Sequence, residues 1–135
     1  MLKELYTKCI ISPQEPIDFW RVSVMSRHTL NDGVTPDARI IEGETFDEWR
    51  REFAPPAMLV GAWYRNELTW EEFERQYFAF LQSEEMKSHV ATFAQRCMSE
   101  IMTLLCSEKT ADQCHRRLLA EELRKYQPDL TIIHR

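Results

Sequence analysis

Apolar and polar residues alternate in two segments near the start of the chain, and a denser apolar run occurs later. The two alternating segments predict strands that expose one face, and the second of them contains two valines. The run from Ile101 to Cys106 is almost entirely apolar, which is typical of a strand buried on both faces. The predicted strands are residues 5–11, 20–25, 100–106 and 130–133.

Helical spacing of apolar residues dominates the middle of the chain. Thr45 with Glu48, and Thr69 with Glu72, have the spacing of capping boxes, and Ala54 is followed by two prolines that end a helix. A polar stretch over 26–43 predicts a long loop, and loops of this length often carry function. The predicted helices are residues 46–53, 57–65, 70–81, 84–97 and 111–126.

The end of the chain reads as a strand, a helix and a second strand. Such a unit implies parallel pairing with a right-handed crossover. We therefore predict an α/β fold: a single three-layer domain over residues 1–135, with a mostly parallel sheet of about four strands and flanking helices.

Composition restricts the classes of function. The net charge of −5 argues against broad binding to nucleic acid, because phosphate neutralisation needs a basic surface. No apolar run reaches the roughly 20 residues of a membrane helix, and the start shows no secretory signal, so we expect a cytoplasmic protein without membrane contact. The four cysteines are then expected to be reduced.

Candidate chemistry lies where the third predicted strand ends at Cys106. Ligands of open parallel sheets bind beyond the carboxyl ends of the strands. Cys106 could act there as a thiolate nucleophile, with Glu108 or His115 as the catalytic acid or base. The alternative is that Cys106 is a small core residue, as free cysteines commonly are.

Positive residues accumulate at the start of the following helix. His115, Arg116 and Arg117 stand where the helix dipole disfavours cations, by about 0.3–1 kcal/mol per charge. A small anionic ligand would offset them, although Glu108 and Asp112 are internal alternatives. The predicted binding residues are Arg27, His28, Cys114, Arg116 and Arg117, and neither a metal nor a cofactor is assigned.

Three other functions remain as alternatives. Cys106, Cys114 and His115, with His28, could hold a metal, but adjacent Cys114 and His115 are expected to point apart and no C-x2-C pair occurs. A Cys106–Cys114 redox pair lacks the usual C-x-x-C spacing, and Cys106 to Arg116 does not match the C-x5-R loop of tyrosine phosphatases. The aromatic helices could also bind a partner or a second copy, although a core role is the simpler interpretation.

These motifs resemble those of the "domain of unknown function 488" family, a group of small prokaryotic proteins. The opening strands are similar to those of the family, the middle of the chain is similar to its short, YeaO-type branch, and the last motif is similar to the signature of its longer branch. The resemblance is carried by Tyr6-Thr-Lys8, Arg21-Val22, Phe46-Asp-Glu-Trp49, Trp70-Glu-Glu-Phe73, Leu104-Leu-Cys106-Ser-Glu108 and Cys114-His-Arg116.

Membership would imply an α/β fold with a largely parallel sheet and no particular reaction. The sequence departs from the short branch after the second strand. That branch places Asp-Arg and Trp-Pro-Arg-Gly there, whereas Met25-Ser-Arg-His-Thr-Leu stands here. Some relatives carry a DNA-repair label, which the acidic balance of this chain does not support.

Overall fold

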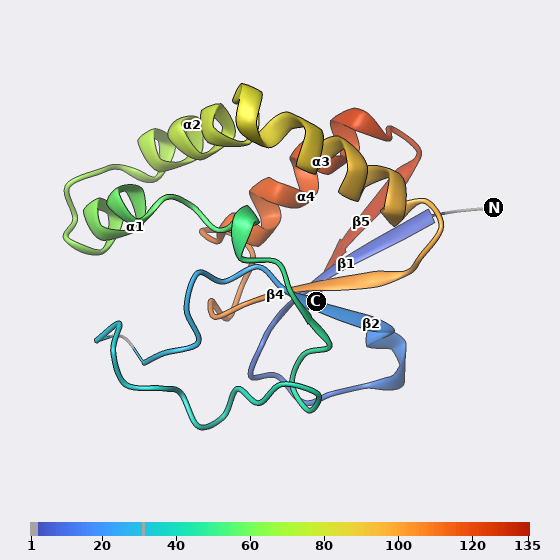
Figure 1. Cartoon of the computed structure of the whole chain (residues 1–135), viewed down its shortest axis with the longest axis horizontal. Helices are drawn as coiled ribbons and strands as arrows, with labels where there is room; N and C mark the ends of the chain where they lie inside the picture. Colours follow the sequence, from blue (N-terminus) through green and yellow to red (C-terminus); the bar gives the residue numbers. More distant parts are fainter. Residues whose placement is uncertain (1–2, 31) are drawn as a thin grey trace.

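A computed structural model describes residues 3–30 and 32–135 and contains one sheet of five parallel strands. The strand order is β3-β2-β4-β1-β5, and Figure 1 shows β1, β4 and β5 crossing the molecule together. β4 is central, and it pairs with β1 on one side and β2 on the other. The strands are β1 (Lys3–Cys9), β2 (Trp20–Ser23), β3 (Glu48–Trp49), β4 (Met102–Cys106) and β5 (Leu130–His134). The α/β class is confirmed.

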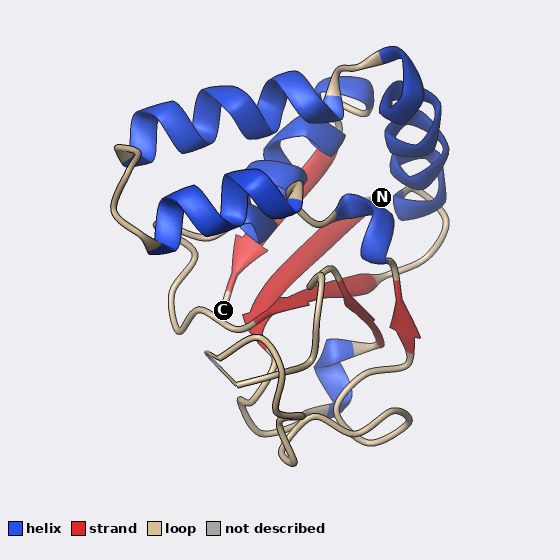
Figure 2. Cartoon of the chain, turned by 60° about the vertical axis from the view of Figure 1, so that its left-hand side comes forward, coloured by secondary structure: helices blue, strands red, loops and turns tan. Residues whose placement is uncertain are grey.

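The four α-helices gather on one face of the sheet, as Figure 2 shows. The opposite face carries loops and the short 3-10 helix η1 (Pro16–Asp18), which is fixed by the Lys8–Asp18 ion pair and by the Thr103 hydroxyl donating to the Asp18 carbonyl. Right-handed crossovers explain this division, because connections that run in opposite directions along the sheet cover opposite faces. The helices are α1 (Ala57–Tyr64), α2 (Trp70–Leu81), α3 (Glu84–Cys97) and α4 (His115–Tyr126).

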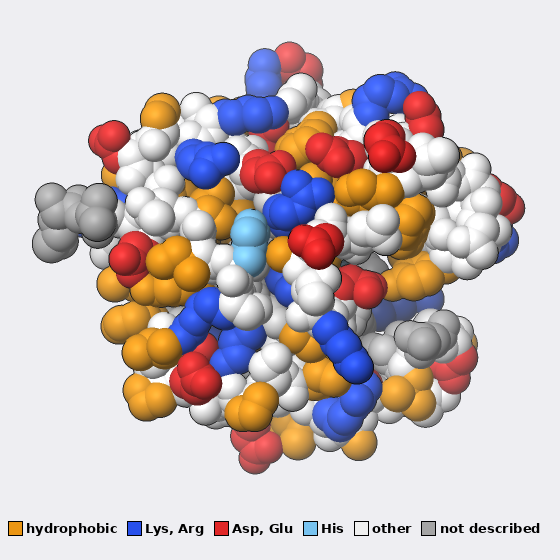
Figure 3. Space-filling model, turned by 180° about the vertical axis from the view of Figure 1, so that it is seen from behind, with side chains coloured by type: hydrophobic (Ala, Val, Ile, Leu, Met, Phe, Trp, Pro, Cys, Tyr) orange, Lys and Arg blue, Asp and Glu red, His pale blue; other side chains and the backbone are white. Residues whose placement is uncertain are grey.

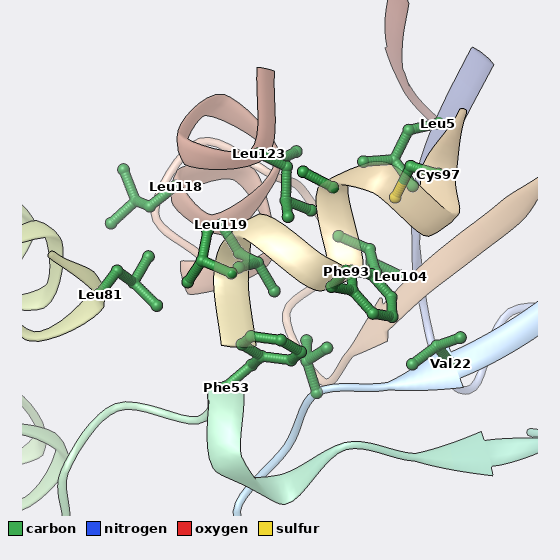
Figure 4. Close-up of a cluster of buried hydrophobic side chains, with 14 of the residues drawn as sticks. Leu5, Val22, Phe53, Leu81, Phe93, Cys97, Leu104, Leu118, Leu119 and Leu123 are labelled. Atoms are coloured by element: carbon green, nitrogen blue, oxygen red, sulfur yellow. The ribbon is translucent and has the colours of Figure 1, made fainter. Parts of the chain in front are cut away.

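The main core lies between the sheet and the helices. Leucine and phenylalanine side chains of the helices meet Leu5, Val22 and Leu104 from the strands (Figure 4). All five residues of β4 are buried, as its unbroken apolar run predicts. The aromatic residues of α2 contribute Phe73 and Tyr77 to this core, which agrees with the core interpretation of the aromatic helices.

The helix predicted over residues 46–53 is wrong. The segment forms the short edge strand β3 followed by the 3-10 helix η2 (Arg51–Phe53). The Thr45 hydroxyl bonds to the backbone of Ile41 instead of capping a helix. The Asp47 carboxylate accepts from the backbone and side chain of Arg21, which draws the segment onto the free edge of β2. Tertiary contacts therefore override a local capping pattern.

Other boundaries move by a few residues. The predicted start of the last helix at Ala111 is wrong, because α4 begins at His115 with Cys114 as its N-cap. The first strand begins at Lys3 and ends at Cys9, earlier than predicted. The long loop is confirmed as irregular apart from isolated bridges such as Thr29 with Pro36, and residue 31 lies outside the described residues.

The described helices are short, and one face of the surface is mixed in charge. Among the described residues, no helix is long and apolar enough to cross a bilayer. Figure 3 shows Lys and Arg side chains interspersed with Asp and Glu over one face of the molecule.

Candidate active site

Cys106 is the last residue of the central strand, at the carboxyl edge of the sheet. It stands in register with Cys9, the last residue of β1, whose thiol donates to the Ser107 carbonyl. Only 4% of Cys106 is exposed. The chain then crosses residues 107–113 and enters α4, so the strand end and the helix start lie beside each other, as the sequence predicts.

His115, the first residue of α4, faces the Cys106 thiol. Its Nδ1 lies 3.6 Å from Cys106 Sγ, and its Nε2 lies 2.8 Å from the carbonyl oxygen of Val24, which follows β2. Because a carbonyl only accepts hydrogen bonds, Nε2 must carry a hydrogen. The neutral ring therefore presents Nδ1 to the thiol as an acceptor. A nucleophile, a base and a group that orients the base are the parts of an activated thiol site.

Cys114 converges on the same point, which corrects the expectation that it and His115 point apart. The Cys106, Cys114 and His115 donor atoms all lie within 4.8 Å of one another. Adjacent residues in a helix project about 100° apart. Here Cys114 is the N-cap, with extended backbone angles (φ −136°, ψ 139°), so that separation does not apply.

Arg116 is the most unusual residue of the site, because its guanidinium is completely buried. Nη1 donates to the Glu108 carbonyl oxygen at 2.7 Å and to Cys114 Sγ at 3.3 Å. Nε and Nη2 have no hydrogen-bond partner in the described part of the chain, and no carboxylate there forms an ion pair with Arg116. Guanidinium groups stay positively charged in proteins, so an unbalanced positive charge lies beside the two thiols.

The two thiols differ in acidity. A hydrogen bond from Cys114 and the nearby Arg116 charge lower the pKa of Cys106, although burial acts in the opposite direction. The same contact with Cys106, together with burial, raises the pKa of Cys114 well above its usual range. Cys97, in α3, provides an internal comparison, because burial raises its pKa to about 12. Cys106 is therefore the more acidic thiol of the pair.

Sequence reasoning missed two contributors to the site. Tyr77 of α2 is fully buried, packs edge-on against the His115 ring at a centroid distance of 5.7 Å, and donates its hydroxyl to the Phe53 carbonyl. The Val24 carbonyl is a backbone group, which no residue type signals. Tyr77 is the only hydroxyl-bearing residue on the buried face of its helix, and that was the available clue.

Other predicted residues have different positions. The Glu108 carboxylate accepts from the Tyr64 hydroxyl, and Glu108 contributes its carbonyl to Arg116. Arg117 donates to the carbonyls of Ala111 and Asp112 and pairs with Glu121. The sequence predicted that a bound anion, or the Glu108 and Asp112 carboxylates, would offset the cations at the start of this helix. Backbone carbonyls and the Glu121 carboxylate supply part of that negative charge.

The two loop residues, Arg27 and His28, have partners of their own. Arg27 is exposed and donates to the Gly33 carbonyl. His28 stacks on Trp49 at 3.8 Å and bonds to the Ser23 hydroxyl, and burial lowers its pKa to about 4. The hydrogen bonds of both residues, within the described part of the chain, are thus made away from Cys106.

A shallow depression lies outside the thiol pair. It is formed by the loop between β4 and α4 and is open to solvent. Its lining is polar and of mixed charge: Ser107, Glu108, Lys109, Thr110, Asp112 and Gln113. Neither Cys106 nor Arg116 is among the residues that line it.

The fold and the site together define a parallel α/β domain with a thiol–imidazole pair at the carboxyl edge of its sheet. Residues 5–127 match the family description "active DUF488-N3 subclade". The chain thus belongs to the DUF488 family, as its motifs suggest. Neither a curated protein nor a solved structure matches it significantly.

Proposed function

We propose that this protein is a thiol-dependent enzyme that acts on a small phosphorylated or nucleotide-like molecule, with Cys106 as the nucleophile. The observation that carries the proposal is the distance of 3.6 Å between Cys106 Sγ and a His115 ring whose other nitrogen is held by the Val24 carbonyl. Assignment of the chain to the active subclade of its family agrees with a catalytic role.

The buried charge of Arg116 supports a thiolate at Cys106. An unpaired buried charge costs several kcal/mol, so it needs an anion nearby. Cys114 provides the only side-chain acceptor for this guanidinium among the described residues, and the Cys106 sulfur lies within 4.8 Å of the Cys114 sulfur. One thiolate shared over this pair offsets the charge of Arg116. The start of α4 adds partial positive charge to the same place.

Each group has one role in the proposed reaction. His115 Nδ1 accepts the Cys106 proton, and the Val24 carbonyl holds the imidazolium in place. The thiolate then forms a bond to an electrophilic atom of the substrate while the bond to the leaving group breaks. The imidazolium returns its proton to that leaving group. Arg116 is the positioned cation for the negative charge that moves from sulfur to substrate.

An anionic substrate is favoured by the unused hydrogen-bond donors of Arg116. Its Nε and Nη2 can donate to two oxygens of a phosphate, which is the geometry in which arginine binds such groups. Lys109 lines the depression outside and adds a positive charge on the approach path. Because Cys106 is nearly covered, residues 107–113 have to move aside before the substrate reaches it.

A metal ion is the competing interpretation of the same three donors. A divalent ion bound by two thiolates forms a neutral unit and leaves the charge of Arg116 unbalanced, as a thiolate–imidazolium pair also does. Charge balance therefore does not separate the two interpretations, and metal analysis of the purified protein does.

Alkylation by iodoacetamide, mapped by mass spectrometry, tests the nucleophile. We expect Cys106 to react faster than Cys97 near neutral pH, because thiolates react and thiols do not. His115→Gln should slow the Cys106 reaction and leave Cys97 unchanged. His89→Gln is the matched control, since His89 is exposed on α3. A Cys106 no more reactive than Cys97 in the folded protein would end the proposal.

A further inference from the structure

The two thiols of the site carry a second chemistry that simple nucleophilic catalysis does not need. We infer that Cys106 is a peroxide-sensitive modification site and that Cys114 is its resolving thiol, so that oxidation closes a Cys106–Cys114 disulfide and switches the site off. The switching part of this inference rests on the proposed function. Disulfide formation itself does not.

The placement of the thiols supports this assignment. Their sulfur atoms lie within 4.8 Å of each other, in a cluster that belongs to a single chain. Cys97 packs in the main core, whereas Cys9 stands in register with Cys106 on the neighbouring strand but is not part of this donor cluster, and its thiol donates to the Ser107 carbonyl. A pair of adjacent thiols of unequal acidity is the arrangement that an attacking and a resolving cysteine require.

The backbone allows the two sulfurs to approach. Cys106 is fixed in the central strand, whereas Cys114 precedes the first turn of α4. Seven residues connect them, and of these only Ala111 is buried. Cys114 and Cys106 are both members of one small buried cluster, so the two sulfurs approach each other within that cluster. The wide spacing of the two cysteines in sequence is therefore compatible with pairing, although it lacks the C-x-x-C form.

The chemistry balances with hydrogen peroxide as the oxidant. The Cys106 thiolate attacks one peroxide oxygen, the O–O bond breaks, and hydroxide leaves, which gives a sulfenic acid at Cys106. The Cys114 sulfur then attacks that sulfur and the S–O bond breaks. The oxygen leaves as water with the Cys114 proton. The two thiols lose two electrons, which peroxide accepts.

Oxidation also changes the charge at Arg116. A disulfide removes the thiolate that balances the guanidinium, and it removes the free Cys114 sulfur that accepts from Nη1. The loop that contains Glu108 then covers a buried Arg116 charge that no anion balances, which disfavours the closed position of the loop. We therefore expect the 107–113 segment to become more exposed to solvent when the disulfide forms.

Peroxide treatment of the intact chain, followed by quenching and peptide mapping, tests the inference. The expected product is a Cys106–Cys114 linkage with a loss of about 2 Da that a thiol reductant reverses. In Cys114→Ser, Cys106 should instead gain about 16 or 32 Da as sulfenic or sulfinic acid. The matched control Cys97→Ser should form the linkage as the parent does. Hydrogen exchange should rise over 107–113 only in variants that form it.

The outcomes separate this inference from the proposed function. If Cys106 alkylates rapidly but peroxide leaves Cys114 reduced and oxidises Cys106 to the sulfinic acid, the disulfide is refuted and the nucleophile stands. If the linkage forms but Cys106 alkylates no faster than Cys97, the nucleophile is refuted and the modification site stands. Equal oxidation of Cys97 and Cys106 in the folded protein refutes the selectivity on which the inference depends.

Discussion

Replacing Arg116 with methionine removes a buried charge while keeping a side chain of similar length. Nη1 lies 3.3 Å from Cys114 Sγ, which in turn lies within 4.8 Å of Cys106 Sγ. The guanidinium and the Cys106 thiolate are thus no more than about 8 Å apart, which at an effective dielectric constant of about 20 gives at least ~2 kcal/mol of attraction. Losing this attraction lowers the thiolate population about thirtyfold at a pH where the thiol form dominates.

The expected change in rate is smaller than the change in population. A more basic thiolate is a better nucleophile, and this recovers nearly half of the logarithmic loss. Alkylation of Cys106 in Arg116→Met should therefore slow about five- to tenfold at neutral pH, and its pH profile should move to higher pH. The assay is iodoacetamide labelling across pH, with Cys106 and Cys97 quantified separately in the same digest.

Two further variants separate charge from packing. Arg116→Lys keeps a positive charge and should recover part of the rate. Arg117→Met removes a neighbouring charge whose guanidinium bonds to Ala111, Asp112 and Glu121 instead, so it should alter Cys106 labelling less. If folded Arg116→Met labels Cys106 as fast as the parent, the thiolate is not stabilised by Arg116. The charge argument for the site then fails.

Three other predictions follow from the structure. His28 has a pKa of about 4 in the fold against 6.5 for a solvent-exposed histidine, so the unfolded chain binds more protons than the folded chain between these values. The free energy of unfolding, measured in urea, should therefore fall as the pH drops from 6.5 towards 4. His28→Gln should flatten that dependence, and His89→Gln should not. Tyr77→Phe removes a buried hydrogen bond to the Phe53 carbonyl and should cost about 1–2 kcal/mol of unfolding free energy by the same measurement. Purified protein should contain far less than one zinc per chain by elemental analysis, and a stoichiometric ion removed only by chelation would show that Cys106, Cys114 and His115 hold a metal instead of a free thiolate.

The sequence predicted the parts of the fold that local pattern determines. β4 was recognisable because all of its residues are apolar or small and all are buried. α2 and α3 were recognisable because Thr69 and Ser83 cap them, and both caps form in the structure. The carboxyl edge of β4 followed from the parallel connection, so the position of Cys106 could be predicted from the chain alone.

The missed features depend on contacts between distant segments. β3 forms because the edge of β2 is free and Arg21 holds Asp47 there, and no local pattern reports this. The burial of Arg116 could have been predicted, because Arg116 shares a helix face with Leu119 and Leu123. Its charge at the start of a helix was interpreted instead as a contact to an anionic ligand. Cys114 and His115 both approach Cys106 because Cys114 is the N-cap of α4. The sequence placed the start of this helix at Ala111, so it did not predict that geometry.

The strand order also governs when this protein can fold during synthesis. β1 and β2 come early in the chain, but in the sheet they are separated by β4, and each pairs with it. A nascent chain that ends before residue 102 thus has strands without their central partner. Such long-range pairing slows folding, because the chain must close large loops before the contacts form. The ribosome must release β4, and with it Cys106, before either the sheet or the site can exist.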